Sequence, residues 1–301
     1  MRTIKMTMMG LILLSTSVFA DSNTIRLLLR EVQYSNDTPV RVSAVETLRD
    51  FITDNDVERT LINVVSNTAE DRLIRMAAVK ALSPEADERN IYDAIVRAHD
   101  QSSDTEFRAT CLQAMYLAAT KSNNIQRGLI ANLLNAPAVE IRRAAAFGLM
   151  ASTSDRNVRE SLTNVAMNPR NDVRQRVEAI KSLYARSTDS RLRQNIQAIA
   201  ENGNDNLNVR VAAIRFMTTF PQGTRARNVL ERLIELGGDT RVRSMAAQAV
   251  RFNLREADVR WFHLTTDPRG NFSRDPFEGA EAFNFTKVNK SLENGGGLNF
   301  N

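Results

Sequence analysis

The chain has 301 residues, of which 43% are hydrophobic and 25% charged, with a formal net charge of +5. This composition is that of a folded protein, and its charge is too balanced for a dedicated nucleic-acid binder. The single cysteine, Cys111, excludes an intrachain disulfide and a thiolate metal cluster. Scarce glycine (12) and proline (7) favour helices over sheets.

The N-terminal segment, Met1–Ala20, predicts a secretory signal peptide. Arg2 and Lys5 precede an apolar run over Met6–Leu14, and small or branched residues end at Ala20. The alternative, a membrane anchor, needs roughly 20 apolar residues, and this run is shorter. Cleavage would leave 38 basic and 35 acidic residues, a net charge of +3. We therefore expect an exported protein, periplasmic or extracellular in a bacterium, with no membrane span in its mature form.

One arginine returns along the chain at spacings of 34, 33, 34, 34, 34 and 33 residues, with an alanine or cysteine three places later and an apolar residue seven places later. Offsets of three, four and seven define one face of a helix. The residue four places before the arginine is Asp or Asn in six of seven copies, as expected for a helix N-cap. The repeat arginines are Arg41, Arg75, Arg108, Arg142, Arg176, Arg210 and Arg243, and the Asp caps are Asp37, Asp71, Asp104, Asp172 and Asp239.

A second apolar helical stripe precedes each of these helices, for example Leu61, Ile62 and Val65. Helix pairs joined by short polar loops at a constant period predict an all-α fold, an α-solenoid of about seven helix pairs. The expected organisation is a signal peptide over 1–20, a repeat array over 21–265 that ends in a helix at Glu256–Thr265, and a Phe/Asn/Gly-rich tail over 266–301.

The Asp-x-x-Val-Arg-x-x-Ala-Ala pattern, clearest in Asn206–Ala213 and Asp239–Ala247, resembles HEAT-like repeats of the short class also found in phycobilin-lyase relatives. The resemblance covers about Ser22–Leu264. Tetratricopeptide and ankyrin repeats have similar periods, but their signature residues do not recur here. The family includes bilin lyases, so the resemblance leaves a lyase-like enzyme as an alternative. Expected export argues against it, because those lyases work in the cytoplasm.

Two columns of arginine are candidate sites. For the repeat arginines, a structural ladder paired with the capping Asp of the same or the next unit is favoured over a polycationic groove, because a residue present in every unit is explained first by stacking. A second column in the first helices contains Arg26, Arg59, Arg127, Arg159, Arg193, Arg227 and Arg260, with polar caps expected at Ser22, Asn55, Asn123, Asp155 and Asp189. For this second column a solvated or ladder-paired arrangement is again favoured. Extra arginines, Arg143 among them, crowd the fourth to sixth units; a solvated face is the favoured interpretation there too, and if any patch binds an acidic partner, we expect it there first.

The tail carries five of the thirteen phenylalanines and follows Trp261. Disordered tails are poor in aromatics, so we expect it either to cap the open end of the repeat core or to bind a partner. The candidate partner-binding residues are therefore Arg143, Arg159, Arg193, Arg227, Trp261, Phe272, Phe277, Phe283 and Phe285.

No catalytic motif or metal-ligand spacing stands out, and we expect neither a catalytic residue, a cofactor nor a metal. Cys111 occupies an alanine position of the repeat and is expected to be a buried packing residue, and His99 and His263 are assigned to structure. The expected function is an exported scaffold or adaptor that binds an envelope or extracellular protein. An inhibitor or assembly factor of an envelope enzyme, and a binder of anionic envelope polymers, are the alternatives.

Overall fold

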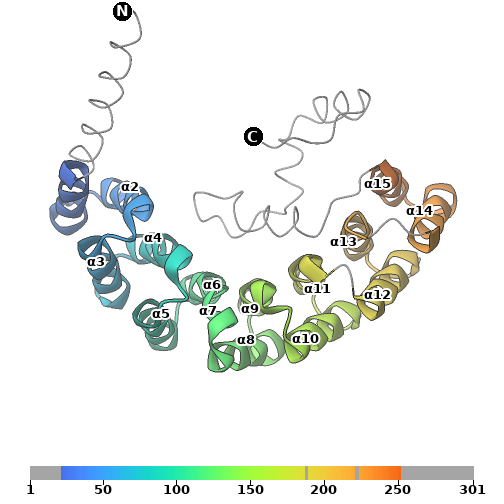
Figure 1. The fold of residues 1–301 in the computed structure, drawn as a ribbon, viewed down its shortest axis with the longest axis horizontal. Coiled ribbons are helices and arrows are strands. Elements are labelled where there is room, and N and C mark those ends of the chain that lie inside the picture. Colours follow the sequence, from blue (N-terminus) through green and yellow to red (C-terminus); the bar gives the residue numbers. More distant parts are fainter. Residues whose placement is uncertain (1–21, 187–188, 221–223, 252–301) are drawn as a thin grey trace, which may run out of the picture. The chain divides into compact units, whose positions relative to one another are not determined.

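The computed structural model describes residues 22–186, 189–220 and 224–251. The expected signal peptide (Met1–Ala20), the closing helix (Glu256–Thr265) and the tail (Thr266–Asn301) lie outside the described residues. Within the described ranges all regular structure is helical and falls into seven consecutive helix pairs (Figure 1), which confirms the all-α solenoid of helix pairs expected from the 34-residue period.

The chain divides after Ile125 into two compact units, here called unit 1 and unit 2. Unit 1 contains three pairs: the helix over 22–34 with α2 (Thr38–Leu48), α3 (Asn55–Ser66) with α4 (Arg72–Leu82), and α5 (Arg89–Gln101) with α6 (Thr105–Ala114). Short 3-10 turns, η1 (Arg49–Phe51) and η2 (Ser83–Glu85), follow α2 and α4, and the four-residue α7 (Ala118–Lys121) follows α6.

Unit 2 contains four pairs. They are α8 (Asn123–Asn135, which begins just before the division) with α9 (Val139–Gly148), α10 (Arg156–Met167) with α11 (Val173–Ser182), α12 (Ser190–Glu201) with α13 (Leu207–Met217), and α14 (Thr224–Leu236) with α15 (Thr240–Arg251). The turns η3 (Met150–Ser152) and η4 (Tyr184–Arg186) follow α9 and α11.

Each unit has two layers of helices. In unit 1 the second helices of the pairs pack in a row, α2 on α4 and α4 on α6. In unit 2 the row is α9, α11, α13 and α15, and each of the last three also packs on the first helix of its own pair. The alanine column lies inside these rows: Ala78, Ala145, Ala179 and Ala213 are fully buried, as is Cys111 at the same position. Small side chains there let neighbouring helices approach closely, as the sequence predicted.

The N-caps of the second helices are confirmed. Side chains of Asp37, Asp71, Asp104, Asp172 and Asn206 accept backbone N–H groups in the first turn, and Asp239 accepts from the N–H of Arg241. Two predicted caps of the first helices are wrong by one residue. Asp54 caps α3 in place of Asn55, and the Ser122 hydroxyl accepts from the Ile125 N–H in place of Asn123.

Because of the shifted caps, the arginines of the second column do not all occupy the same position relative to the N-cap of their helix. Asp155 and Asp189 cap α10 and α12 as predicted, so Arg159 and Arg193 lie four residues after their caps. In α3 the residue four after the cap is Glu58 rather than Arg59, and in α8 it is Gln126 rather than Arg127. Arg59 and Arg127 are therefore out of register with Arg159 and Arg193, because a sequence spacing near 34 tolerates a one-residue slip that a helical face does not.

The residue just before the repeat arginine differs in burial between the first pair and the later described pairs. In the second to seventh pairs this residue is buried, with an exposed fraction between 0% and 2%; the residues are Ile74, Phe107, Ile141, Gln175, Val209 and Val242. In the first pair the same position is Val40, which is 40% exposed. The first pair thus presents at its surface a position that is buried in every later described pair.

Candidate functional site

In four pairs the repeat arginine ties the two helices of its own pair together. The last carbonyl groups of a helix have no partner within that helix, and the arginine side chain donates to one of them. Arg41 Nε lies 2.8 Å from the Val32 carbonyl oxygen, and Arg176 Nε lies 2.9 Å from that of Ala166. Arg75 donates to Val65 and Arg210 to Ala200 in the same way, at 3.0–3.2 Å.

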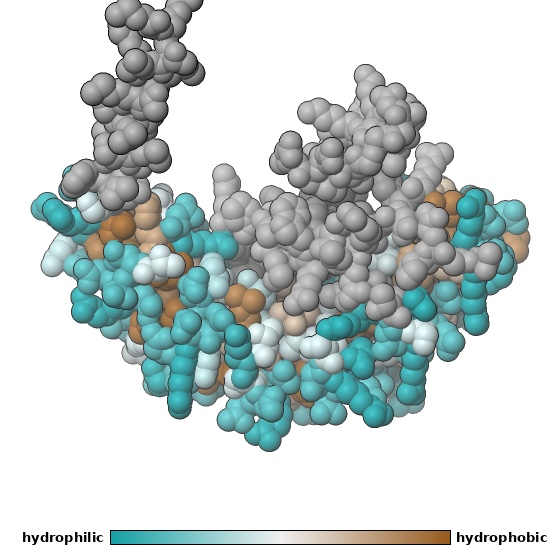
Figure 2. All heavy atoms as spheres, in the orientation of Figure 1, coloured by the Kyte–Doolittle hydropathy of each residue, from teal (hydrophilic) through white to brown (hydrophobic). Residues whose placement is uncertain are grey.

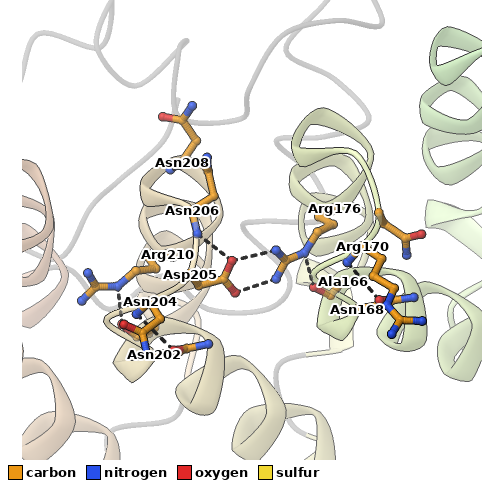
Figure 3. Close-up of polar contacts among 12 residues, drawn as sticks. Ala166, Asn168, Arg170, Arg176, Asn202, Asn204, Asp205, Asn206, Asn208 and Arg210 are labelled. Atoms are coloured by element: carbon orange, nitrogen blue, oxygen red, sulfur yellow. Dashed lines mark hydrogen bonds and ion pairs between the residues drawn. The ribbon is translucent and has the colours of Figure 1, made fainter.

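In two pairs the same guanidinium also forms a bidentate ion pair with a carboxylate of the next pair. Arg176 forms two hydrogen bonds to the Asp205 carboxylate, at 2.7 and 2.6 Å, and the two side chains are only 2% and 6% exposed (Figure 3). Arg41 bonds both oxygens of Glu70 in the equivalent arrangement. A planar guanidinium matches a carboxylate in this two-bond geometry, which adds direction to the attraction.

The carboxylate partners correct the expected pairing. Where this bidentate pair forms, the partner is the residue immediately before the N-cap of the next second helix, Glu70 or Asp205. The capping residue itself, Asp71 or Asn206, uses its side chain within its own helix. The sequence does hold a signal for this position. Asn67, Asn168 and Asn202 each end a first helix, accept the N–H two residues later, and stand three residues before Glu70, Asn171 and Asp205.

Asp205 is ionised at a lower pH than an ordinary aspartate. Burial by itself raises its pKa, but hydrogen bonds from Arg176 and from the Asn206 N–H, with the charges of Arg176 and Arg210, outweigh burial and lower the pKa. Asp205 therefore stabilises the fold at pH values above its unfolded pKa, and this stabilisation is lost as the pH falls through the lowered folded value.

The remaining joints use other contacts. Arg75 has its guanidinium carbon 4.2 Å above the centre of the Phe107 ring, a cation–π contact with the next pair. Arg142 donates from Nε to Gln175 Oε1 at 2.9 Å and from a terminal nitrogen to the Ala136 and Pro137 carbonyls. Arg108 is half-buried and Arg243 exposed. These contacts support the structural interpretation of the column, because most of its guanidinium groups are occupied by the protein's own acceptors.

The predicted partner-binding arginines do not form one cluster. Arg159 is half-buried in α10, donates to the Thr153 and Ser154 carbonyls and lies 3.2 Å from Asp189. Arg193 is half-buried in α12, whereas Arg227 is exposed in α14 and pairs with Glu231. Arg143 lies in α9, in the other helix layer. Trp261, Phe272, Phe277, Phe283 and Phe285 lie outside the described residues.

A different set of residues shares one side of the second-helix row. These residues stand two before, one after and five after each repeat arginine, positions that lie within about 60° of one another around a helix of 3.6 residues per turn. In unit 2 we call them the unit-2 face: Glu140, Arg143, Phe147, Arg174, Val177, Lys181, Asn208, Val211, Arg215, Arg241, Ser244 and Gln248. In unit 1 the equivalent unit-1 face comprises Pro39, Val42, Glu46, Leu73, Met76, Lys80, Glu106, Ala109 and Gln113.

The two faces differ in charge. The unit-2 face has five cations and one carboxylate, a net charge of +4, and it still has +3 when the α15 residues are left out so that three helices are compared with three. The unit-1 face has one lysine and two glutamates, a net charge of −1. This contrast arises at positions that vary between repeats while the repeat arginine stays the same.

Neighbouring helices bring the residues of the unit-2 face together. Arg174 of α11 lies 3.4 Å from Glu140 of α9, and Arg143 of α9 lies 4.0 Å from the largely buried Glu178 of α11. Phe147 is 9% exposed, and Val177 and Val211 are partly exposed between the cations. The face therefore offers positive charge with apolar side chains between the charges. Figure 2 shows one side of the molecule, on which hydrophobic residues occur in groups among hydrophilic ones.

Two chemically reactive side chains of the described residues, Cys111 and His99, are buried. Burial raises the pKa of the Cys111 thiol to about 12, which keeps it protonated near neutral pH. His99 is 6% exposed, with Nδ1 2.8 Å from Asp100. Among residues 22–186, 189–220 and 224–251, no three His, Cys, Asp or Glu side chains come together as metal ligands. None of the helices in those ranges has both the length and the apolar character needed to span a bilayer.

Comparison with known proteins identifies no family. No protein-family model matches the chain, and no curated protein matches it. Among solved structures, an X-ray structure of Escherichia coli YibA is similar, with 18% sequence identity and a TM-score of 0.44, over 76% of this chain and 82% of YibA.

Proposed function

We propose that the chain is a helical-repeat scaffold that binds a protein partner, and that the unit-2 face is its binding surface. The observation that carries this proposal is the charge of +4 on the unit-2 face against −1 on the equivalent positions of unit 1. Stacking explains the residues that every repeat shares, so a difference at repeat-equivalent surface positions needs another cause. Complementary charge steers a partner to its site and fixes its orientation.

The partner presents carboxylates together with apolar side chains. Phe147, Val177 and Val211 lie between the cations and would contact apolar groups of a protein, which an anionic polysaccharide or polyphosphate lacks. This favours a protein over an anionic envelope polymer. The Asp-x-x-Val-Arg-x-x-Ala-Ala repeats support a place among the short HEAT-like repeat proteins, and residues 1–20 support export to the bacterial periplasm or beyond.

The proposal is tested by neutralising the face. The variant Arg174→Gln/Lys181→Gln/Arg215→Gln removes three positive charges from the unit-2 face. The control, Arg156→Gln/Arg191→Gln/Arg225→Gln, removes three exposed arginines from first helices of the same unit. A photo-cross-linking residue at Val177 captures neighbours in cells. We expect the wild type and the control to give a cross-linked product with the partner protein. This product should be lost in the face variant, and its yield should fall as the salt concentration rises.

Capture that persists in the face variant, or that is lost equally in the control, would remove this surface as the binding site. Salt-sensitive binding of a polyphosphate or an acidic polysaccharide, with no protein captured, would decide for the polymer instead.

The scaffold is also proposed to be without enzymatic activity. With a buried thiol of raised pKa, Cys111 should react with a thiol reagent such as 5,5′-dithiobis(2-nitrobenzoate) only as fast as the surrounding repeats open. Labelling of the native protein as fast as that of the denatured protein would revive the lyase-like alternative.

A further inference from the structure

The unit-2 face calls for an acidic ligand with apolar side chains, and the chain itself contains such a sequence. Asp275–Phe285 reads Asp-Pro-Phe-Glu-Gly-Ala-Glu-Ala-Phe-Asn-Phe. It has three carboxylates, no cation and three phenylalanines. We propose that Asp275–Phe285 binds the unit-2 face and competes there with the partner. This inference rests on the proposed function and names the regulation of the same surface.

Within residues 252–301, a net negative charge is found only in this segment. Residues 252–274 contain four arginines and three acidic residues, and residues 286–301 contain two lysines and one glutamate. Both flanks are thus slightly basic, whereas the eleven residues between them have a net charge of −3. The unit-2 face has the opposite charge, +4, so the two are complementary in sign and similar in size.

The apolar groups correspond in the same way. Phe147, Val177 and Val211 come from three neighbouring helices and occupy equivalent or adjacent positions between the cations. Neighbouring packed helices are about 8–10 Å apart. Phe277 and Phe283 are six residues apart, which an extended chain spans in roughly 20 Å. Two phenylalanines of the segment can therefore contact the apolar side chains of two or three helices while Glu278 and Glu281 face the cations.

The connection to the folded part is long enough. The described residues end at Arg251 in α15, and 23 residues separate this position from Asp275. A fully extended connection spans about 75–80 Å, and a flexible coil of that length has a root-mean-square span near 26 Å. The row from α15 to α9 includes three helix-to-helix steps, or about 30 Å. The segment can thus reach all of the unit-2 face from its own chain.

Attachment to the same chain makes even weak binding effective. Short flexible linkers give effective concentrations in the millimolar range. A segment with an intrinsic dissociation constant of about 100 µM would then occupy the face in roughly nine molecules of ten and lower the partner's apparent affinity about tenfold. The partner must present the same chemistry in a tighter form, namely acidic residues alternating with aromatic or large apolar ones.

The experiment uses the full-length protein with a photo-cross-linking residue in place of Phe283. We expect cross-links within one chain to peptides of α9, α11 and α13. These cross-links should disappear in the neutralised segment, Asp275→Asn/Glu278→Gln/Glu281→Gln, and in the face variant Arg174→Gln/Lys181→Gln/Arg215→Gln. They should persist in the first-helix control Arg156→Gln/Arg191→Gln/Arg225→Gln. Partner affinity should rise about tenfold in the neutralised segment.

The inference would be overturned by cross-links to the first helices, or by cross-links that persist in both the neutralised segment and the face variant. Cross-links that join isotopically labelled to unlabelled copies would overturn it too, since they would make a second chain the occupant. The two proposals fail separately. If the partner still needs the face but the segment does not cross-link to it, only the competition is wrong. If the segment cross-links to the face but partner capture ignores the face, the proposed function is wrong.

Discussion

Units 1 and 2 place the same arginine at the same helical position but surround it differently. In unit 1 the bidentate partner of Arg41 is Glu70, and the two side chains are 19% and 12% exposed. In unit 2 Arg176 and Asp205 form the equivalent pair at 2% and 6% exposure. On the exposed side of the same helices, unit 1 is nearly neutral and unit 2 strongly basic. The repeat motif therefore builds both units, while the depth of its ion pairs and the charge of its surface are set by residues outside the motif.

The largest difference between the units should appear when the buried pair is broken. Replacement of one partner leaves a buried charge without compensation, which costs about 3–5 kcal/mol. We expect this loss for Arg176→Met, and only about 1–2 kcal/mol for Arg41→Met, because water reaches Glu70 more easily. Urea unfolding followed by hydrogen exchange in each unit measures both, since the units need not unfold together.

A double variant serves as the control for this comparison. Arg176→Met/Asp205→Leu removes both charges and should recover much of the loss, because a buried ion pair can often be replaced by apolar side chains. Equal losses for Arg176→Met and Arg41→Met would show that burial of the pair does not distinguish the two units.

The second largest effect concerns Gln175, a polar residue at a position that is apolar in the other pairs. Its side-chain amide donates to the Leu133 carbonyl at 2.9 Å and accepts from Arg142. Gln175→Val restores the repeat pattern but leaves both groups unpaired, at about 1–3 kcal/mol. Hydrogen exchange in α9 and α11 measures the loss, and Ile141→Val in α9, at about 0.5–1.5 kcal/mol, is the matched apolar control. A gain in stability would contradict this role for Gln175.

As the pH is lowered, the two units should lose stability at different pH values. Burial lowers the pKa of His99, and the charge of Arg108 adds to this effect, whereas the hydrogen bond from His99 to the Asp100 carboxylate opposes it. The folded state then binds the proton less readily than the unfolded state, so unit 1 loses stability as the pH falls below about 6.5. Asp205 in unit 2 has a lowered pKa, so its contribution is retained until the pH falls below about 4.

Hydrogen exchange of each unit between pH 7 and 3 checks this order. His99→Gln should flatten the pH dependence of unit 1 near pH 6, and Asp205→Asn should flatten that of unit 2 below pH 4. The expectation fails if unit 2 loosens first, or if His99→Gln leaves the profile of unit 1 unchanged.

The smallest expected effect tests the open surface of the first pair. Val40→Thr should change stability by less than about 0.5 kcal/mol, because Val40 is 40% exposed. Val209→Thr at the same repeat position in unit 2 buries a hydroxyl and should cost about 1–3 kcal/mol. Thermal unfolding of both variants gives the comparison. A large loss in Val40→Thr would show that another part of the protein covers this position.

The fold was accessible from the sequence because its signals are local and repeated. A cap, an arginine, an alanine and an apolar residue at fixed offsets specify one helix, and their recurrence specifies the pairs. The caps at Asp54 and Ser122 were missed because adjacent polar residues, Asn55 and Asn123, are equally good caps by type, and only the backbone geometry decides between them.

The candidate site was less accessible, for a physical reason. Glu70 and Asp205 pair across repeats, but the other loops carry a different residue at this position. The seven repeats therefore show no column of carboxylates in the sequence. The unit-2 face depends on which positions remain exposed after two layers have packed. Arg143 was predicted from the sequence as a candidate binding residue. Lys181 and Arg215 belong to the unit-2 face only because α11 and α13 lie beside α9 in one row.

Gln175 has a consequence for how the chain folds. Repeats that resemble one another can stack in the wrong order, because apolar residues such as Ile74 or Val242 fit many neighbours equally well. An amide that must meet both the Leu133 carbonyl and the Arg142 guanidinium is more selective, because in four other pairs the repeat arginine itself already donates to a carbonyl near the end of the first helix. Buried polar contacts that select one arrangement over others are known from coiled coils. Gln175 would thus favour stacking of the fifth pair on the fourth over a stack that skips or exchanges a repeat.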